Sequence, residues 1–103
     1  MITSDTRTLP DKEVVFTEMQ NGDSVLLHLG TGQYFTLNQT GTLIWQSLEK
    51  GLSVDEISQV LVDGFDVEAD KALQSVIDLV SELANESLVR ETDSADNKAS
   101  SDG

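Results

Sequence analysis

The chain has 103 residues, and its 19 Asp and Glu outnumber its six Lys and Arg, which gives a formal net charge of -13. This length predicts a single domain, and the acidic balance argues against binding to nucleic acid and to anionic membrane surfaces, both of which attract Lys and Arg. Since the sequence contains no Cys and one His, it excludes disulfides, Cys-based zinc sites, thiol nucleophiles and His-rich metal sites, and we expect no metal and no cofactor.

The first segment, residues 1–12, is polar and contains no apolar stretch of the kind that forms the centre of a signal peptide. No part of the chain approaches the ~18 consecutive apolar residues of a membrane-spanning helix. We therefore expect a cytoplasmic protein without membrane association, with residues 1–12 as a flexible N-terminus.

Three short strands are predicted after this segment. Residues 13–19 and 24–29 are rich in β-branched and apolar side chains, and the Asn21-Gly22 pair between them is the strongest short signal for a β-hairpin. A glycine-containing turn at 30–32 leads into residues 33–37, which have the composition of a third strand. The expected sheet is a three-stranded antiparallel meander, and such a small sheet has edge strands with unpaired backbone groups.

Two helices are predicted after the third strand. Asn38 is a favourable N-cap residue, and apolar side chains at helical spacing follow within residues 43–48 before Gly51 ends the helix. Ser53 and Glu56 have the spacing of a capping box, which predicts the start of the second helix.

The third helix is expected to be the longest, at about residues 67–86. When its residues are placed at about 100° steps, the apolar side chains cover a wide arc instead of the narrow stripe of a helix with one buried face. This width indicates either that the helix contacts a second surface or that it lies deep in a small core, and the sequence leaves both interpretations open. Leu88 and Val89 are expected to be extended, and residues 92–103 to form a disordered tail.

The predicted fold is an α+β domain over residues 13–91, with a three-stranded antiparallel sheet followed by three helices. No nucleophile elbow, phosphate-binding loop or metal motif is present in the sequence, so we predict no catalytic residues. The acidic residues at 55–56 and 68–70 fall at helix starts, where carboxylates interact favourably with the helix dipole without any catalytic purpose.

Several short motifs resemble the PqqD family, the small proteins of coenzyme PQQ biosynthesis, and the related elements that recognise precursors of ribosomally synthesised and modified peptides (RiPPs), lasso peptides included. The motifs are the Leu-rich second strand, GQYFTLN at 32–38, Gly41 with Ile44-Trp45, VDEI at 54–57 and FDV at 65–67. They all fall within residues 13–91, so only the two ends of the chain lie outside the resemblance.

The resemblance implies a winged-helix-like, non-catalytic domain that binds the leader segment of a precursor peptide. It further implies that the leader adds as an extra strand to the third strand, lies between this strand and the third helix, and is delivered to a modifying or processing enzyme such as a radical-SAM protein or a leader peptidase. Together with the wide apolar arc, it predicts these peptide-binding residues: Gln33, Tyr34, Phe35, Thr36, Leu37, Leu73, Val76, Ile77 and Val80. Which edge of the helix faces the peptide stays open, and we expect a monomer or a weak dimer because a free strand edge can also pair with a second copy.

Other residues are expected to have structural roles. Trp45 should pack in the core, as an aromatic residue on the inner side of an amphipathic helix does. Tyr34 and Phe35 point to opposite faces of their strand, so one should join the core and the other should be free to touch a peptide. His28 alternates with leucines and is expected to be an exposed strand residue.

Two alternative functions are compatible with the predicted order of elements. A winged-helix transcription regulator would need a basic recognition helix, and residues 66–86 hold a single Lys among an excess of acids. A structural or regulatory subunit that docks on a biosynthetic enzyme, without any peptide substrate, fits the same fold because fold does not determine function.

Overall fold

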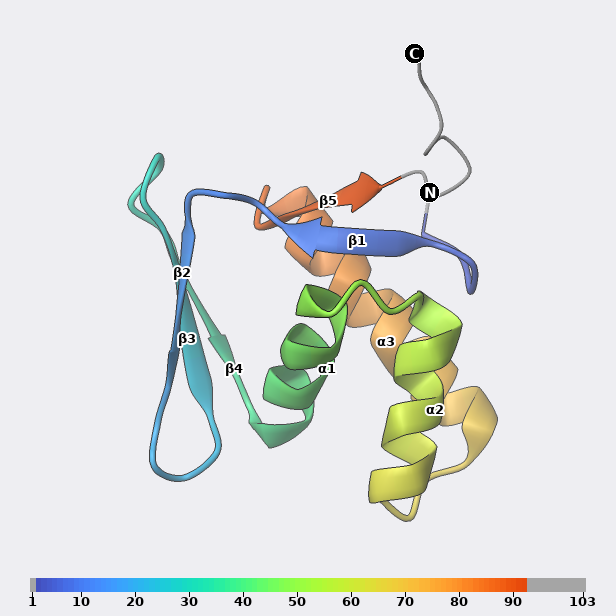
Figure 1. Cartoon of the computed structure of the whole chain (residues 1–103). Coiled ribbons are helices and arrows are strands. Elements are labelled where there is room, and N and C mark those ends of the chain that lie inside the picture. The colour runs from blue at the N-terminus through green and yellow to red at the C-terminus, as the bar shows by residue number, and fades with distance from the viewer. Residues whose placement is uncertain (1, 93–103) are drawn as a thin grey trace.

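The computed structural model of the chain describes residues 2–92, and Figure 1 shows its arrangement. Its elements in chain order are β1 (Arg7–Pro10), β2 (Val14–Glu18), β3 (Ser24–His28), β4 (Tyr34–Leu37), α1 (Gln39–Glu49), α2 (Val54–Gly64), α3 (Ala69–Asn85) and β5 (Val89–Thr92). The predicted α+β order of three strands and three helices is confirmed for β2 to α3. Within the described residues no helix is long and apolar enough to cross a membrane.

The three-stranded sheet is antiparallel with the order β2-β3-β4, so β4 lies at one edge and β2 at the other. Gly22 in the first turn and Gly32 in the second have φ angles of 91° and 76°, which L residues with a side chain rarely adopt. The two predicted turns are therefore confirmed, and they connect the strands into the expected meander.

The helix starts follow the capping signals of the sequence. The Asn38 side chain accepts a hydrogen bond from the Gly41 N–H at 2.8 Å, and Ser53 and Glu56 form a complete capping box. α3 is slightly shorter than expected, and its N-cap residue Glu68 makes no capping hydrogen bond through its side chain. The three helices are confirmed, with bounds that differ from the prediction by a few residues.

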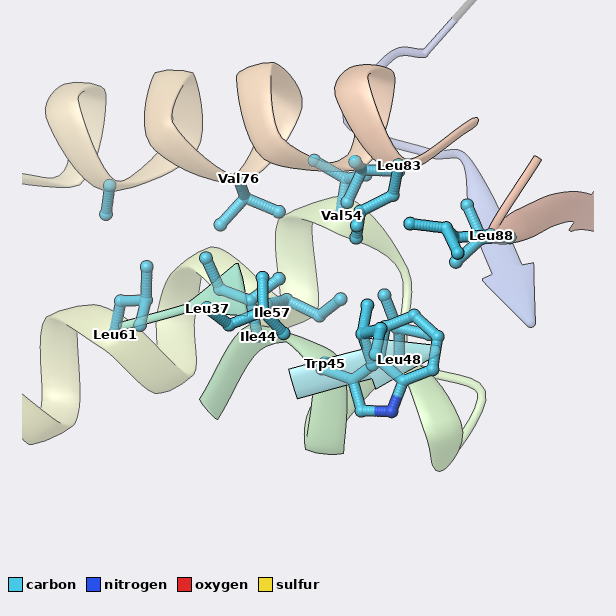
Figure 2. Packing of buried hydrophobic residues seen from close by; sticks show 14 residues of the cluster. Leu37, Ile44, Trp45, Leu48, Val54, Ile57, Leu61, Val76, Leu83 and Leu88 are labelled. Carbon is cyan, nitrogen blue, oxygen red and sulfur yellow. The ribbon is translucent and has the colours of Figure 1, made fainter. Parts of the chain in front are cut away.

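The core lies between the inner face of the sheet and the three helices, and Figure 2 shows its packing. Trp45 is 1% exposed, as predicted, and its ring stacks on Phe16 with the centroids 6.3 Å apart. The Trp45 indole N–H also donates to the Glu49 carboxylate at 3.0 Å, so its polar atom is satisfied.

The N-terminal segment differs from the prediction. Residues 7–10 form β1, which pairs antiparallel with β5 in a separate two-stranded sheet, and Arg7 lies opposite Thr92. The segment is tied down further, since the Val54 N–H donates to the Thr6 carbonyl and Asp55 N–H to the Ser4 carbonyl, each at 2.9 Å. Residues 2–12 are therefore largely part of the folded body, and Met1 lies outside the described part of the chain. Of the predicted tail 92–103, residues 93–103 also lie outside it.

The expectation that His28 is exposed is wrong. His28 is 7% exposed, and its Nδ1 atom accepts hydrogen bonds from the backbone N–H groups of Gly30 at 3.1 Å and Thr31 at 3.2 Å. The side chain stabilises the turn between β3 and β4. The alternation with leucines is real, but Leu27 of β3 and the adjoining Leu29 face outward, and His28 faces inward.

Candidate functional site at the β4 edge

A groove of about 710 Å³ lies between β4, the start of α1 and α3. Its floor is buried and apolar, formed by Leu37, Ile44 and the backbone of Gly41, and its rim is polar and exposed. The residues that line it are Phe35, Thr36, Leu37, Asn38, Thr40, Gly41, Ile44, Ser75, Leu79 and Glu82. An apolar floor with a few polar groups around it is typical of sites that hold a ligand by packing and orient it by hydrogen bonds.

A second hollow of about 250 Å³ continues this groove. It shares Thr36, Leu37 and Asn38 with the larger one and extends toward Met19 and Asp23 of the β2-β3 hairpin. The concave surface therefore follows β4 from Phe35 to Leu37 and continues past the end of the strand.

The free edge of β4 offers backbone hydrogen-bonding groups to the groove. The His28 N–H donates to the Gln33 carbonyl at 3.0 Å, which fixes the alternation along the antiparallel pair. By this alternation Phe35 and Leu37 bond to β3, and the N–H and C=O groups of Tyr34 and Thr36 point away from it. No other element among residues 2–92 pairs with this edge.

Gly41 brings α1 close to β4. A Cβ atom at this position would lie 3.2 Å from both Cβ and Cδ2 of Leu37 and 3.3 Å from the Asn38 Oδ1 atom. A glycine inside a helix destabilises it. Here the glycine lets the α1 backbone lie close to Leu37 and Asn38 at the groove floor. This signal was available in the sequence, because Gly41 interrupts an otherwise regular helix.

The wall contributed by α3 consists of Ser75, Leu79 and Glu82. These residues are four and three positions apart, so they share one side of the helix. Glu82 is the charged residue among the residues that line the groove, so the rim carries negative charge.

The predicted α3 residues lie elsewhere. Val76 and Val80 are both 0% exposed in the core, behind the groove wall. Leu73 and Ile77 are partly buried against the core, and Ile77 lies roughly 160° around the helix from Leu79, given 3.6 residues per turn. The edge of the apolar arc that faces the groove is therefore the Leu79 edge, which the sequence had left open.

The predicted β4 residues are brought together, with different roles. Phe35, Thr36 and Leu37 line the groove, and Tyr34 is 72% exposed on the outer side of the sheet. The expectation that one aromatic ring joins the core and the other stays free is confirmed, since Phe35 packs against the core. Gln33 precedes the strand, and its carbonyl is already bonded to β3. Asn38, Thr40, Gly41, Ile44, Ser75, Leu79 and Glu82 are groove residues that the sequence-based prediction missed.

A second polar cluster lies at the far end of the sheet, where Asp11, Glu13 and His28 bring potential ligand atoms within 4.8 Å of one another. The Nδ1 atom of His28 accepts two backbone hydrogen bonds, so the neutral ring carries its proton on Nε2, which lies 4.0 Å from the Asp11 carboxylate. In this tautomer Nε2 offers no lone pair to a metal. The cluster is a support for the turn and does not form part of the groove.

Comparison with known proteins gives one family and a pair of similar structures. The model of the family described as coenzyme PQQ synthesis protein D (PqqD) matches residues 23–89. The comparison with curated proteins gives no match.

Two solved structures share the fold over most of both chains. TbiB1 in complex with the TbiA(beta) leader peptide is 32% identical with a TM-score of 0.74, over 80% of this chain and 94% of that one. Lasso peptide synthetase B1 complexed with the leader peptide is 28% identical with a TM-score of 0.74, over 82% of this chain and 98% of that one.

Proposed function

Because the chain belongs to the PqqD family, we propose that it is a non-catalytic module that binds the leader segment of a ribosomally synthesised precursor peptide and delivers it to a modifying or processing enzyme. The observation that carries this proposal is the unpaired edge of β4 beside a groove of about 710 Å³. It is supported by the two similar structures, both of which are complexes with a leader peptide. A module acting on ribosomal products works in the cytoplasm, where they are made.

The leader adds to β4 as a fourth strand. The outward-pointing N–H and C=O groups of Tyr34 and Thr36 supply backbone hydrogen bonds that depend little on the peptide sequence. Strand addition of this kind uses backbone pairing for affinity and side-chain pockets for selectivity. The neighbouring protein surface must therefore distinguish one peptide from another.

Selectivity comes from the groove. Alternate side chains of an added strand point to the same face, so every second residue of the leader enters the space between β4 and α3. There it meets the apolar floor at Leu37 and Ile44 and the wall at Leu79, with Glu82 at the rim. Val76 and Val80 fix the position of the wall from behind, while Leu73 and Ile77 hold the opposite flank of α3 in the core.

The partner enzyme is a radical-SAM protein or a leader peptidase that acts on the part of the precursor beyond the leader. A bound leader leaves the rest of the precursor free for this enzyme, since the groove accommodates only a short stretch of extended chain. The module then raises the local concentration of substrate without taking part in the chemistry.

Proline substitution at the strand edge tests this proposal. In Thr36→Pro the ring removes an N–H group that points to the free edge, so the pairing of β4 with β3 is retained while the peptide loses a donor and meets the ring. We expect the Kd for a fluorescently labelled leader of any precursor peptide that the wild type binds to rise by about tenfold or more in an anisotropy titration.

Glu18→Pro is the matched control, because the Glu18 N–H points to the free edge of β2 by the same alternation. This variant should bind the leader like the wild type. Equal affinities of the wild type and Thr36→Pro would contradict strand addition to β4.

A further inference from the structure

The solvent-facing side of the β2-β3-β4 sheet is more apolar than its position predicts. An antiparallel sheet covered on one face normally turns polar side chains outward. Here β3 turns Ser24 and His28 inward, both of them buried, and turns Val25 and Leu27 outward. We call the outward-facing apolar residues of the sheet and its adjoining turns the outer face: Val15, Met19, Val25, Leu27, Leu29 and Tyr34.

The outer face is continuous across all three strands. Val15, Leu27 and Tyr34 lie in one row, since Leu27 is the Cα partner of both other residues. Tyr34 is 72% exposed, Leu29 62%, Met19 47% and Val15 43%, and the other large apolar residues exposed to this degree among residues 2–92 are only Leu9 and Phe65. A concentration of exposed apolar side chains on one face marks a protein interaction site.

The sequence that follows the described residues is polar. Residues 93–103 read DSADNKASSDG and contain two Ala as their only apolar residues. A second copy would bring two chains of net charge -13 together, which repulsion opposes. The outer face therefore fits a different protein.

The charges around the outer face define this partner further. Glu13 lies opposite Leu29 at one end of the sheet, and Asp23 lies opposite Met19 at the other, as the backbone bonds of these two pairs show. Six residues separate positions 13 and 19 along the extended chain, so the two charged ends of the outer face lie roughly 20 Å apart. A complementary surface has an apolar centre with Lys or Arg at both ends, the usual anatomy of an interface with an apolar core and a polar rim.

We propose that the outer face is the docking surface for the enzyme that acts on the bound peptide, and that this enzyme presents an apolar patch flanked by basic side chains. This inference rests on the proposed function. The two surfaces are joined by β4, because Tyr34 belongs to the outer face and also turns its backbone to the edge where the leader is added. An enzyme on the outer face lies directly beside the leader strand and leaves open the groove of about 710 Å³, which Met19 does not line.

The test measures enzyme binding and leader binding on the same variants. A purified peptide-modifying or leader-cleaving enzyme that acts on the bound precursor is titrated, by biolayer interferometry, against the immobilised chain saturated with leader. In Val15→Thr/Leu29→Thr, at two exposed positions of the outer face that do not line the groove, we expect at least tenfold weaker enzyme binding. The Kd for the leader should change by less than twofold.

Leu9→Thr is the matched control, because Leu9 is also exposed but belongs to the β1-β5 sheet. It should leave enzyme binding unchanged. The inference is overturned if the double variant binds the enzyme like the wild type, if the wild type does not bind the enzyme, or if sedimentation shows a wild-type dimer that the double variant abolishes. If the wild type does not bind the leader, the proposed function is overturned instead.

Discussion

Leu79 is the apolar side chain through which α3 contributes to the groove wall. Leu79→Ser should weaken leader binding by about tenfold, because it removes an apolar anchor at the centre of the contact. Leu73→Ser is a matched control, since Leu73 is also partly buried on α3 but lies on its opposite flank. Isothermal titration of both variants checks this prediction, and an equal effect of both on the Kd would show that the wall has been assigned to the wrong side of α3.

Glu56 couples the capping box of α2 to the N-terminal segment. Its pKa is lowered chiefly by the hydrogen bond from the Ser53 backbone N–H at 2.8 Å, and then by the charge of Arg7, whose guanidinium donates to the carboxylate at 3.0 Å. Because its pKa is depressed in the folded state, the ionised Glu56 carboxylate stabilises the fold. This stabilisation is complete above the ordinary Glu pKa of about 4.3, and it is lost as the pH falls through the lower pKa that Glu56 has in the folded state.

We therefore expect Glu56→Gln to be less stable than the wild type at pH 7, and the difference to shrink as the pH falls below about 4. Thermal unfolding followed by circular dichroism between pH 3 and 7 checks this. A stability difference that stays constant across the acidic range would contradict the assigned role of the Glu56 charge.

Some residue roles could be predicted from the sequence, and others could not. The capping roles of Asn38, Ser53 and Glu56 were predictable because the capping signals are local in sequence. The inward position of His28 and the choice of Leu79 over Ile77 depend on strand register and on the packing direction of α3. Both are tertiary properties that helical and strand periodicity alone do not determine.

At the scale of elements, β1 is the largest departure from the prediction. Its four residues include a Pro, which is uncommon inside strands. Its partner β5 lies at the opposite end of the described chain, so the pairing cannot be predicted from local sequence. The segment also closes over the helices: Arg7 donates to the Gly51 carbonyl at 2.6 Å and Thr8 is 2% exposed. β2 to β4 were predictable because their turns carry glycines at the positions that need them.

Removal of residues 1–10 should therefore destabilise the domain, because it exposes Leu88 and Val89 and leaves the backbone of β5 unpaired. We expect the midpoint of thermal unfolding to fall by roughly 5–10 °C or more, the size of shift that 1–2 kcal/mol produces in a domain of this size. Differential scanning calorimetry makes the comparison. An unchanged midpoint would restore the expectation of a flexible N-terminus.

At the scale of the whole molecule, the two faces of the β2-β3-β4 sheet have different surroundings. The inner face packs on α1 (Figure 1). It also borders the groove, while the outer face presents apolar side chains to solvent. The winged-helix-like order of elements could also suggest DNA binding, but residues 13–91 hold 14 acids and three bases, a balance that phosphate contacts do not tolerate. The charge of the whole chain therefore discriminates between functions that the fold leaves open.

The most direct measurement of the central claim is residue-resolved amide hydrogen exchange, followed by NMR on the labelled chain with and without the leader of any precursor peptide encoded nearby. In the free chain the Tyr34 and Thr36 N–H groups point to an unpaired edge, and an added strand should slow their exchange markedly, with chemical shift changes at Ser75, Leu79 and Glu82. The N–H groups of Phe16 and Glu18 on the β2 edge should exchange at unchanged rates. Saturable binding that protects the β2 edge, or that leaves Tyr34 and Thr36 unprotected, would contradict leader binding by strand addition to β4.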